Sequence, residues 1–410
     1  MNKIKIKNFG AIKDGYRDND GWLDITKVTV FIGNQGSGKS TIAKLISTFT
    51  WIEKALVRGD YDKKWFEKKN RLKNQFLTYH RLDNYLTPSS VIEYQGDVCS
   101  IKYQNDCMMI SELSDQPYPL PQIMYVPAER NLITYIKGAR ELKLSSEALQ
   151  EFNSEYNNAK NEMKEAMKLP INDVEIEYNK QYDNLYLKGN GYKLEITEAS
   201  SGFQSFVPLY LVSNYLANSV KKQSENKDPM SSDEQARFKK GVQEIWSNDS
   251  LTDEQKRVAL SVLSSKFNKS AFVNIVEEPE QNLFPSSQWK MLQSLLGLNN
   301  MNEGNKLIMT THSPYLINYL TVAIKAKQLL DAIFDKNKKN LEPQILEIVP
   351  IHSCVNADEV CIYEMTDDGI IKRLPNYNGI PSDGNFLNKF LADTNDLYAK
   401  LQEIEEENEN

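Results

Sequence analysis

The chain has 410 residues, 40% of them hydrophobic, which allows either one large α/β domain with insertions or two to three smaller domains. Its net charge of −7 argues against a protein that coats nucleic acid through bulk charge, although a local basic face is compatible with it. No apolar run reaches the roughly 18 residues of a membrane span, and the N-terminal alternation of lysine and isoleucine differs from a signal peptide, so we expect no membrane contact and a cytoplasmic location.

Runs of β-branched and aromatic residues predict a strand-rich first third of the chain. The predicted strands lie at residues 3–9, 22–25, 28–32, 91–94, 100–103, 108–110 and 122–126. The short strands between residues 91 and 110 suggest an antiparallel sheet beside the segment that follows residue 32. The 122–126 strand runs into a proline and the charged pair Glu129 and Arg130, as a core strand does when it delivers polar residues to a site.

Residues 54–73 hold eight Lys or Arg against three Asp or Glu, with Tyr61, Trp65 and Phe66 interleaved. This is the best nucleic-acid-binding candidate in the chain, because cations match phosphates and aromatic faces accept bases. The alternative is a solvated amphipathic helix whose aromatic rings pack inward.

The middle of the chain is predicted to be largely helical. Residues 143–168 predict a short helical arm, residues 185–187 and 193–196 a hairpin, and residues 206–216 an apolar helix. The polar stretch 219–270 carries two N-cap patterns and predicts a two-helix insertion.

The last part of the chain begins with two buried strands, predicted at residues 271–276 and 307–309. Further strands are predicted at residues 345–348, 360–363 and 370–372, followed by a helical end and a disordered acidic tail at 403–410.

The segment GNQGSGKST at residues 33–41 directly follows the 28–32 strand and matches the G-x-x-x-x-G-K-[ST] pattern of a phosphate-binding loop. Its glycines let successive backbone N–H groups point at an anion, and the following helix adds its positive end. The motif predicts that Lys39 reaches the β- and γ-phosphates of ATP, Ser40 binds Mg²⁺ and Thr41 bonds the α-phosphate. The predicted nucleotide-binding residues here are Gly33, Asn34, Gln35, Gly36, Ser37, Gly38, Lys39, Ser40 and Thr41.

An apolar strand that ends in two carboxylates supplies what a magnesium nucleotidase needs besides this loop. We assign Glu277 to the water shell of the metal and Glu278 to the attacking water. His312 follows the 307–309 strand, which predicts an imidazole beside the γ-phosphate that senses it. The predicted catalytic residues are thus Lys39, Glu278 and His312.

Four motifs occur in the order used by ABC-type ATPases of the SMC, RecF and overcoming-lysogenization-defect group: GNQGSGKST, SSGFQS at 200–205, IVEEPEQNLFP at 275–285 and TTHSP at 310–314. The chain resembles this group from residue 1 to about 320. The VPAERN stretch, the short helical arm and the C-terminal appendage look most like stand-alone ATPase subunits of PARIS-like bacterial antiphage systems.

This resemblance implies that Ser201 and Gly202, with Gln204 nearby, cap the γ-phosphate bound by a second protomer. Arg130 is a candidate phosphate or inter-subunit contact, or else it pairs with a local carboxylate. The chain departs from the family where Glu277 replaces an aspartate and Phe203 replaces the second signature glycine, so we expect slow turnover more than weakened nucleotide binding.

We therefore expect an α/β fold of the ABC-type P-loop ATPase head, with a mixed sheet, flanking helices, an antiparallel β subdomain and helical insertions. The expected divisions are an N-terminal lobe at 1–127, a helical arm and hairpin at 128–200, a signature helix at 201–218, a helical insertion at 219–270, a C-terminal lobe at 271–320 and an α/β appendage at 321–410.

Two functions compete. The first is an ATP-hydrolysing, Mg²⁺-dependent dimerisation switch in an antiphage defence complex, with a homo-oligomer of at least two copies controlling a separate effector protein. The second is a RecF-like DNA-maintenance clamp, in which the 54–73 face binds duplex DNA weakly. The ATPase subunit of a membrane transporter fits poorly because of the insertions and the unusual signature.

Overall fold

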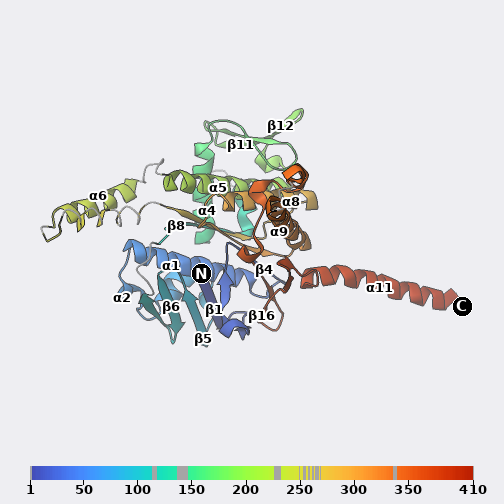
Figure 1. Ribbon diagram of the computed structural model, residues 1–410, viewed down its shortest axis with the longest axis horizontal. Coiled ribbons are helices and arrows are strands. Elements are labelled where there is room, and N and C mark those ends of the chain that lie inside the picture. The colour runs from blue at the N-terminus through green and yellow to red at the C-terminus, as the bar shows by residue number, and fades with distance from the viewer. Residues whose placement is uncertain are drawn as a thin grey trace.

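A seven-stranded sheet forms the centre of the protein (Figure 1). The computed structural model describes residues 2–112, 118–135, 146–225, 232–248, 250–252, 255–256, 259–260, 263, 267, 269–335 and 339–409. In spatial order the strands of the central sheet are β2 (Gly15–Tyr16), β16 (Ile370–Arg373), β15 (Val360–Met365), β4 (Val28–Gly33), β14 (Lys306–Thr311), β13 (Ala271–Glu277) and β8 (Pro121–Val126). The five strands from β15 to β8 run parallel to one another.

The parallel strands are mostly apolar and largely buried because both faces of the sheet are covered. Every residue of β4 and of β13 is buried. Alternate side chains enter two different cores: Val30 and Ile32 belong to one hydrophobic cluster, and Phe31 belongs to the other. This explains why the strands read as continuous hydrophobic runs and not as an alternating pattern.

Helix α1 (Lys39–Arg58) packs on one face of the sheet and separates it from a five-stranded antiparallel sheet (Figure 1). In spatial order that second sheet contains β3 (Leu23–Ile25), β1 (Asn2–Phe9), β5 (Leu86–Gln95), β6 (Cys99–Gln104) and β7 (Cys107–Glu112). The other face is covered by α4 (Glu147–Glu162), α5 (Ser201–Ser224), α8 (Pro285–Asn299) and α9 (Pro314–Asp335).

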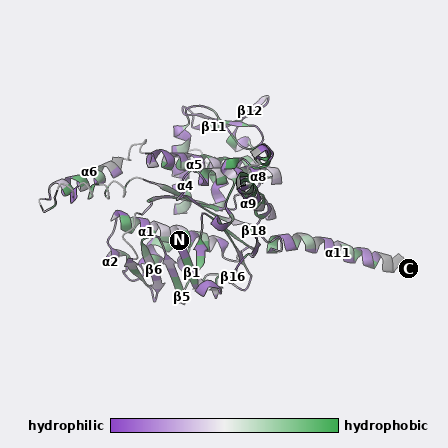
Figure 2. Ribbon diagram, in the orientation of Figure 1, coloured by the Kyte–Doolittle hydropathy of each residue, from purple (hydrophilic) through white to green (hydrophobic). Residues whose placement is uncertain are grey.

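The remaining elements lie at the edges of this layered body. A small antiparallel sheet consists of β12 (Tyr192–Glu195), β11 (Asn184–Gly189), β10 (Glu175–Asn179) and β9 (Met167–Lys168). The short elements are α2 (Lys63–Phe66), α3 (Leu132–Tyr135), α10 (Glu342–Ile348), β17 (Asn376–Tyr377) and β18 (Ile380–Pro381). Helices α6 (Ser232–Trp246) and α11 (Phe386–Glu409) project away from the body, and α11 alternates hydrophobic and hydrophilic residues along its length (Figure 2). Among the described residues no helix combines the length and the apolar character that crossing a membrane requires.

The predicted fold class is confirmed: the protein has a mixed sheet with flanking helices and an adjoining antiparallel sheet. The two strands β15 and β16 come from the segment expected as a C-terminal appendage, yet they pair beside β4 within the central sheet. The domain boundaries stay a prediction. Part of the predicted insertion at 219–270 falls outside the described residues.

Two local predictions were wrong, and one alternative was wrong in part. Residues 345–348 belong to helix α10, whose first turn contains a proline that favours helix initiation, and are not a strand. The tail is helical to Glu409, in a segment rich in the strong helix formers Leu, Glu, Gln, Lys and Ala, and it is not disordered over the described residues. The alternative for residues 54–73 was one amphipathic helix, but Gly59 takes a left-handed conformation that ends α1 at Arg58.

Candidate nucleotide site

Four neighbouring parallel strands deliver the predicted site residues to one edge of the central sheet. In register, Ile32 of β4 lies opposite Thr311 of β14, and Thr310 lies opposite Glu277 of β13. Strand β8 ends beside the same point, because Val126 pairs with Val276. The segments that follow these strands therefore meet at the carboxyl edge, where ligands bind in open α/β sheets.

The loop between β4 and α1 has the backbone of an anion-binding turn. Gly33, Gly36 and Gly38 have φ angles of 148°, 76° and 101°. A Cβ atom at Gly33 would lie 2.4 Å from the carbonyl oxygen of Met365, so no larger residue fits there without a shift of β15. Helix α1 begins directly after Gly38, which places its N–H groups at this turn.

Lys39 lies over the loop with its ammonium group turned toward it. Its Nζ atom donates to the carbonyl oxygens of Gly33 at 2.9 Å and Asn34 at 2.8 Å. Burial lowers the pKa of Lys39 to about 8, and the carboxylates of Glu278, Glu280 and Glu277 oppose this shift. The ammonium is thus a buried cation held among acceptors.

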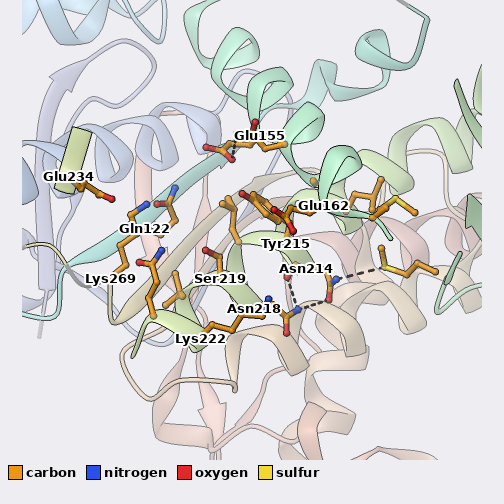
Figure 3. A pocket seen from close by; sticks show the side chains of 18 residues that line it. Gln122, Glu155, Glu162, Asn214, Tyr215, Asn218, Ser219, Lys222, Glu234 and Lys269 are labelled. Atoms are coloured by element: carbon orange, nitrogen blue, oxygen red, sulfur yellow. Dashed lines mark hydrogen bonds between the residues drawn. The ribbon is translucent and has the colours of Figure 1, made fainter. Parts of the chain in front are cut away.

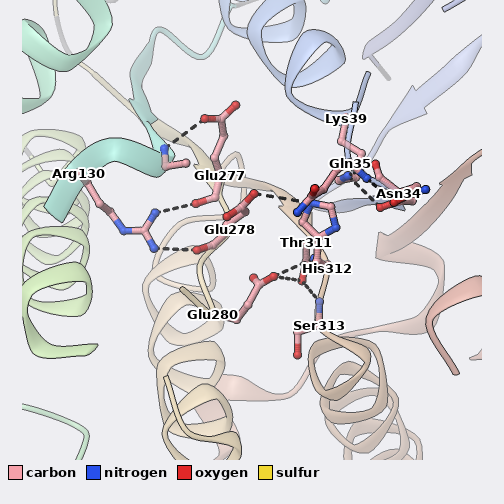
Figure 4. A network of polar contacts seen from close by, with 12 residues as sticks. Asn34, Gln35, Lys39, Arg130, Glu277, Glu278, Glu280, Thr311, His312 and Ser313 are labelled. Carbon is pink, nitrogen blue, oxygen red and sulfur yellow. Dashed lines mark hydrogen bonds and ion pairs between the residues drawn. The ribbon is translucent and has the colours of Figure 1, made fainter. Parts of the chain in front are cut away.

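Glu278 and His312 face each other beside Lys39 (Figure 4). The His312 Nε2 atom is 3.6 Å from the Glu278 carboxylate. Burial and the Lys39 ammonium lower the pKa of His312, and Glu278 partly opposes them, so the imidazole is neutral near pH 7. Glu278 itself has a φ of 43°, a strained angle for a residue with a side chain, and its N–H donates to the Thr310 carbonyl at 2.9 Å.

Glu277 has a carboxylate with one oxygen bonded and one oxygen without a partner. Its Oε2 atom accepts from the Ala128 N–H at 3.2 Å, and its buried Oε1 atom has no hydrogen-bond partner among the described residues. The buried hydroxyl of Ser37 in the loop also lacks a partner there. Because buried polar atoms are normally paired, these two atoms fit a site that also holds phosphate and a hydrated Mg²⁺ ion.

Glu280 fixes the turn that carries His312, a role that the sequence did not reveal. One carboxylate oxygen accepts from the Thr311 hydroxyl and the His312 N–H, each at 2.8 Å (Figure 4). The Ser313 hydroxyl then donates to Gln288 of α8 at 2.6 Å. The spacing of Glu280 after the paired carboxylates was visible in the sequence, but its partners come from another strand.

Arg130 has other partners than those predicted for it. Its guanidinium is fully buried and donates to the carbonyl oxygens of Glu277 and Glu278, both at 2.7 Å (Figure 4). It also donates to the carbonyl oxygens of Pro127 at 3.3 Å and Ser205 at 3.1 Å. Burial lowers its pKa to about 10, still far above neutrality. The structure therefore makes Arg130 a cross-link between β8, β13 and α5.

The signature residues lie at the start of α5, next to the turn after β13. Ser201 is exposed, whereas Gly202 is buried against the backbone of Asn282, where a Cβ atom would lie 2.7 Å from the carbonyl oxygen. The Gln204 side chain donates to the Thr197 carbonyl at 3.0 Å and accepts from the Tyr135 hydroxyl. Of the three predicted residues, only Ser201 presents an exposed side chain.

The aromatic residues of the 54–73 stretch pack on one another. Tyr61 stacks on Trp65 with ring centroids 4.0 Å apart, and the Arg71 guanidinium lies 4.0 Å from the Trp65 ring. Phe66 is fully buried. The rings therefore pack on one another, as in the alternative, although the stretch is not one helix, and they are not open stacking platforms for bases.

A further hollow of about 710 Å³ lies between α4 and α5 (Figure 3). It is lined mainly by polar side chains, among them Gln122, Asn214 and Lys222, and by none of the predicted site residues. Over the described residues no cluster of three or more His, Cys, Asp or Glu side chains could hold a metal.

Comparison with protein families matches residues 254–317 to a family described as an AAA ATPase domain. The match covers less than half of the chain, and it includes Glu277, Glu278 and His312. No curated protein matches the chain. The matched segment and the loop at 33–41 together indicate an ATPase domain.

Several solved structures are similar to the chain at low identity. The SMC head domain from Thermotoga maritima is 12% identical, with 92% of this chain and 98% of that chain covered and a TM-score of 0.36. An SMC head bound to the C-winged helix domain of ScpA is 11% identical, with coverages of 91% and 96% and a TM-score of 0.35. A dimeric ATP-binding cassette in a post-hydrolysis state, bound to ADP and Pi, is 11% identical, with coverages of 92% and 100% and a TM-score of 0.31.

The contacts of Arg130 predict a structural defect in Arg130→Lys. Lysine keeps the charge but lacks the planar fork, so two or more buried carbonyls lose their donor and the free energy of unfolding should fall by about 2–4 kcal/mol. Thermal unfolding without nucleotide measures this effect. Arg17→Lys is the control, because Arg17 forms an exposed ion pair with Asp14. An unchanged melting temperature in Arg130→Lys, together with weaker ATP binding, would restore the phosphate-contact role.

Proposed function

We propose that the protein is an ATP-binding and ATP-hydrolysing ABC-type ATPase that uses nucleotide to drive dimerisation. The observation that carries the proposal is the meeting of the 33–41 loop, the Glu277–Glu278 pair and His312 at the carboxyl edge of adjacent parallel strands. A buried cation beside a backbone anion turn suits a polyphosphate, and two carboxylates next to it suit metal-assisted attack by water.

Each residue then has a distinct task. Lys39 exchanges its two carbonyl acceptors for phosphate oxygens, and the loop N–H groups hold the same phosphates. Ser40 and the free oxygen of Glu277 would hold Mg²⁺ and its water shell, and the ion would neutralise phosphate charge. The Glu278 carboxylate orients the attacking water, and the neutral His312 beside it donates toward the γ-phosphate.

We expect Lys39→Ala to weaken ATP binding about a hundredfold or more, because the phosphate charge loses its buried counter-charge. Calorimetry with Mg²⁺ and ATP measures the affinity. Lys44→Ala, which removes another lysine of the same helix, should bind ATP like the wild type. Equal ATP affinities in Lys39→Ala and wild type would contradict the assignment of the 33–41 loop to phosphate binding.

Glu278→Gln should retain ATP binding and slow hydrolysis by about 10²- to 10⁴-fold, because the amide keeps the shape but cannot orient and polarise the attacking water. Single-turnover hydrolysis measures the rate, and Glu303→Gln, at an exposed loop position, is the matched control. If Glu278→Gln hydrolyses ATP at the wild-type rate, the base lies elsewhere, and Glu280 and Glu277 are the next residues to change.

The proposed dimer rests on the exposed N-terminal end of α5. Ser201 is exposed at the N-terminal end of a 24-residue helix, which favours an anion, while the phosphates on the same protomer would be enclosed by its own loop. The anion at Ser201 would then be the γ-phosphate of an ATP molecule bound by a second copy of the chain. Two loops and two signatures related by a two-fold axis would then enclose two ATP molecules, so that nucleotide stabilises the pair.

Ser201→Arg should abolish ATP-dependent dimerisation, since a long side chain would occupy the space that the γ-phosphate of the partner must enter. Light scattering in the Glu278→Gln background, with and without ATP, measures the effect. Ser250→Arg, in the 219–270 segment, serves as the control. The same ATP-dependent mass in Ser201→Arg and in the control would contradict the signature role.

In this proposal the dimer is the sensor or scaffold of an antiphage defence complex and controls a separate effector protein. A DNA-maintenance clamp is the alternative, and the four exposed lysines Lys63, Lys64, Lys68 and Lys69 are what favour it. The stacked rings beside those lysines support it less. The neighbouring genes distinguish the two, because an adjacent nuclease gene favours the first and repair genes favour the second.

A further inference from the structure

A second, smaller pocket opens beside α1, away from the phosphate loop. Its volume is about 240 Å³, and it lies between α1, the segment 61–80, β8 and α4. The side chains that line it are mostly aromatic: Trp51, Tyr61, Trp65, Phe76, Tyr79, His80 and Tyr125. None of the residues assigned above to nucleotide or metal lines it.

Two polar groups of this pocket are buried without partners. His80 is 4% exposed and Tyr125 is 3% exposed. The Nδ1 atom of His80 forms no hydrogen bond within the described parts of the chain, and neither does the hydroxyl of Tyr125, whose pKa is raised by burial and by the nearby Glu277 carboxylate. Buried groups of this kind destabilise a protein unless something pairs with them. A bound molecule with donors and acceptors on its edge would supply the missing partners.

The surroundings favour a planar and uncharged molecule. Burial lowers the pKa of His80 to about 3, so its imidazole is neutral at physiological pH. The rings of His80 and Tyr125 meet at a centroid distance of 4.7 Å and form a rigid wall. Glu151 also lines the pocket, but its carboxylate already accepts from the Tyr79 hydroxyl, and Tyr61 and Arg71 already contact the Trp65 ring.

The size of the pocket sets a further limit. The pocket volume of about 240 Å³ is below the roughly 300–1,000 Å³ of pockets that take drug-sized ligands, which favours a molecule of one or two fused rings. We propose that this pocket binds a planar, uncharged nitrogen heterocycle of the nucleobase class, whose polar edge pairs with His80 Nδ1 and the Tyr125 hydroxyl. Its occupant would contact Ser47, Thr48 and Trp51 of α1, the helix that begins at the phosphate loop.

The test uses adenine, hypoxanthine, cytosine and uracil as free bases, with calorimetry and intrinsic tryptophan fluorescence on the full chain. Free bases carry no phosphate, so the outcome is independent of the loop at 33–41. We expect saturable binding of at least one base, accompanied by quenching, because Trp51 and Trp65 line the pocket. Tyr125→Phe keeps the ring, removes one hydrogen bond and should weaken binding about tenfold.

One further variant removes a wall of the pocket, and a second serves as a control outside it. Trp51 is 40% exposed, so Trp51→Ala should leave the protein folded while it removes a wall of the pocket and both the binding and the quenching. Tyr103→Phe changes a buried tyrosine outside the pocket and should bind like the wild type. Absence of saturable binding by all four bases, or wild-type affinity in both Tyr125→Phe and Trp51→Ala, would overturn the proposal.

Discussion

The buried guanidinium of Arg130 is the contact on which the geometry of the site depends. It donates to carbonyl oxygens just after β8, at the end of β13 and just after it, and to one in the first turns of α5. Two of these acceptors belong to Glu277 and Glu278, whose side chains are assigned to metal and water. Glu278 has a strained backbone angle, which surrounding contacts must hold in place. The charge-assisted hydrogen bonds from Arg130 therefore help to set the direction of the Glu278 carboxylate.

This cross-link also joins the two halves of the proposed mechanism. The carboxylates are proposed to act on nucleotide bound by the same chain, and the start of α5 is proposed to act on nucleotide bound by a second copy. Ser205 of α5 bonds to Arg130 through its carbonyl and to Gln281 through its hydroxyl at 2.9 Å. A change at the carboxylate turn would therefore reach the proposed interface through a continuous set of hydrogen bonds.

The sequence predicted the parts of the site that depend on neighbouring residues in the chain. The loop at 33–41 and the polar ends of β13 and β14 could be found because each motif lies directly after an apolar run. The partners of Arg130 and Glu280 could not, since their acceptors and donors come from elements far apart in sequence. The 345–348 segment was misassigned because an apolar run so short fits a strand or a helix equally well.

The central claim is that nucleotide phosphate binds at the carboxyl edge shared by β4, β13 and β14. Hydrogen exchange of Glu278→Gln with and without Mg²⁺ and ATP measures this most directly, because bound phosphate protects the amides that it contacts. We expect protection of residues 33–41 and of the turn at 277–282, and protection of 201–205 only at protein concentrations that allow dimers. Protection confined to other segments, with amides 33–41 exchanging as in the free protein, would contradict it.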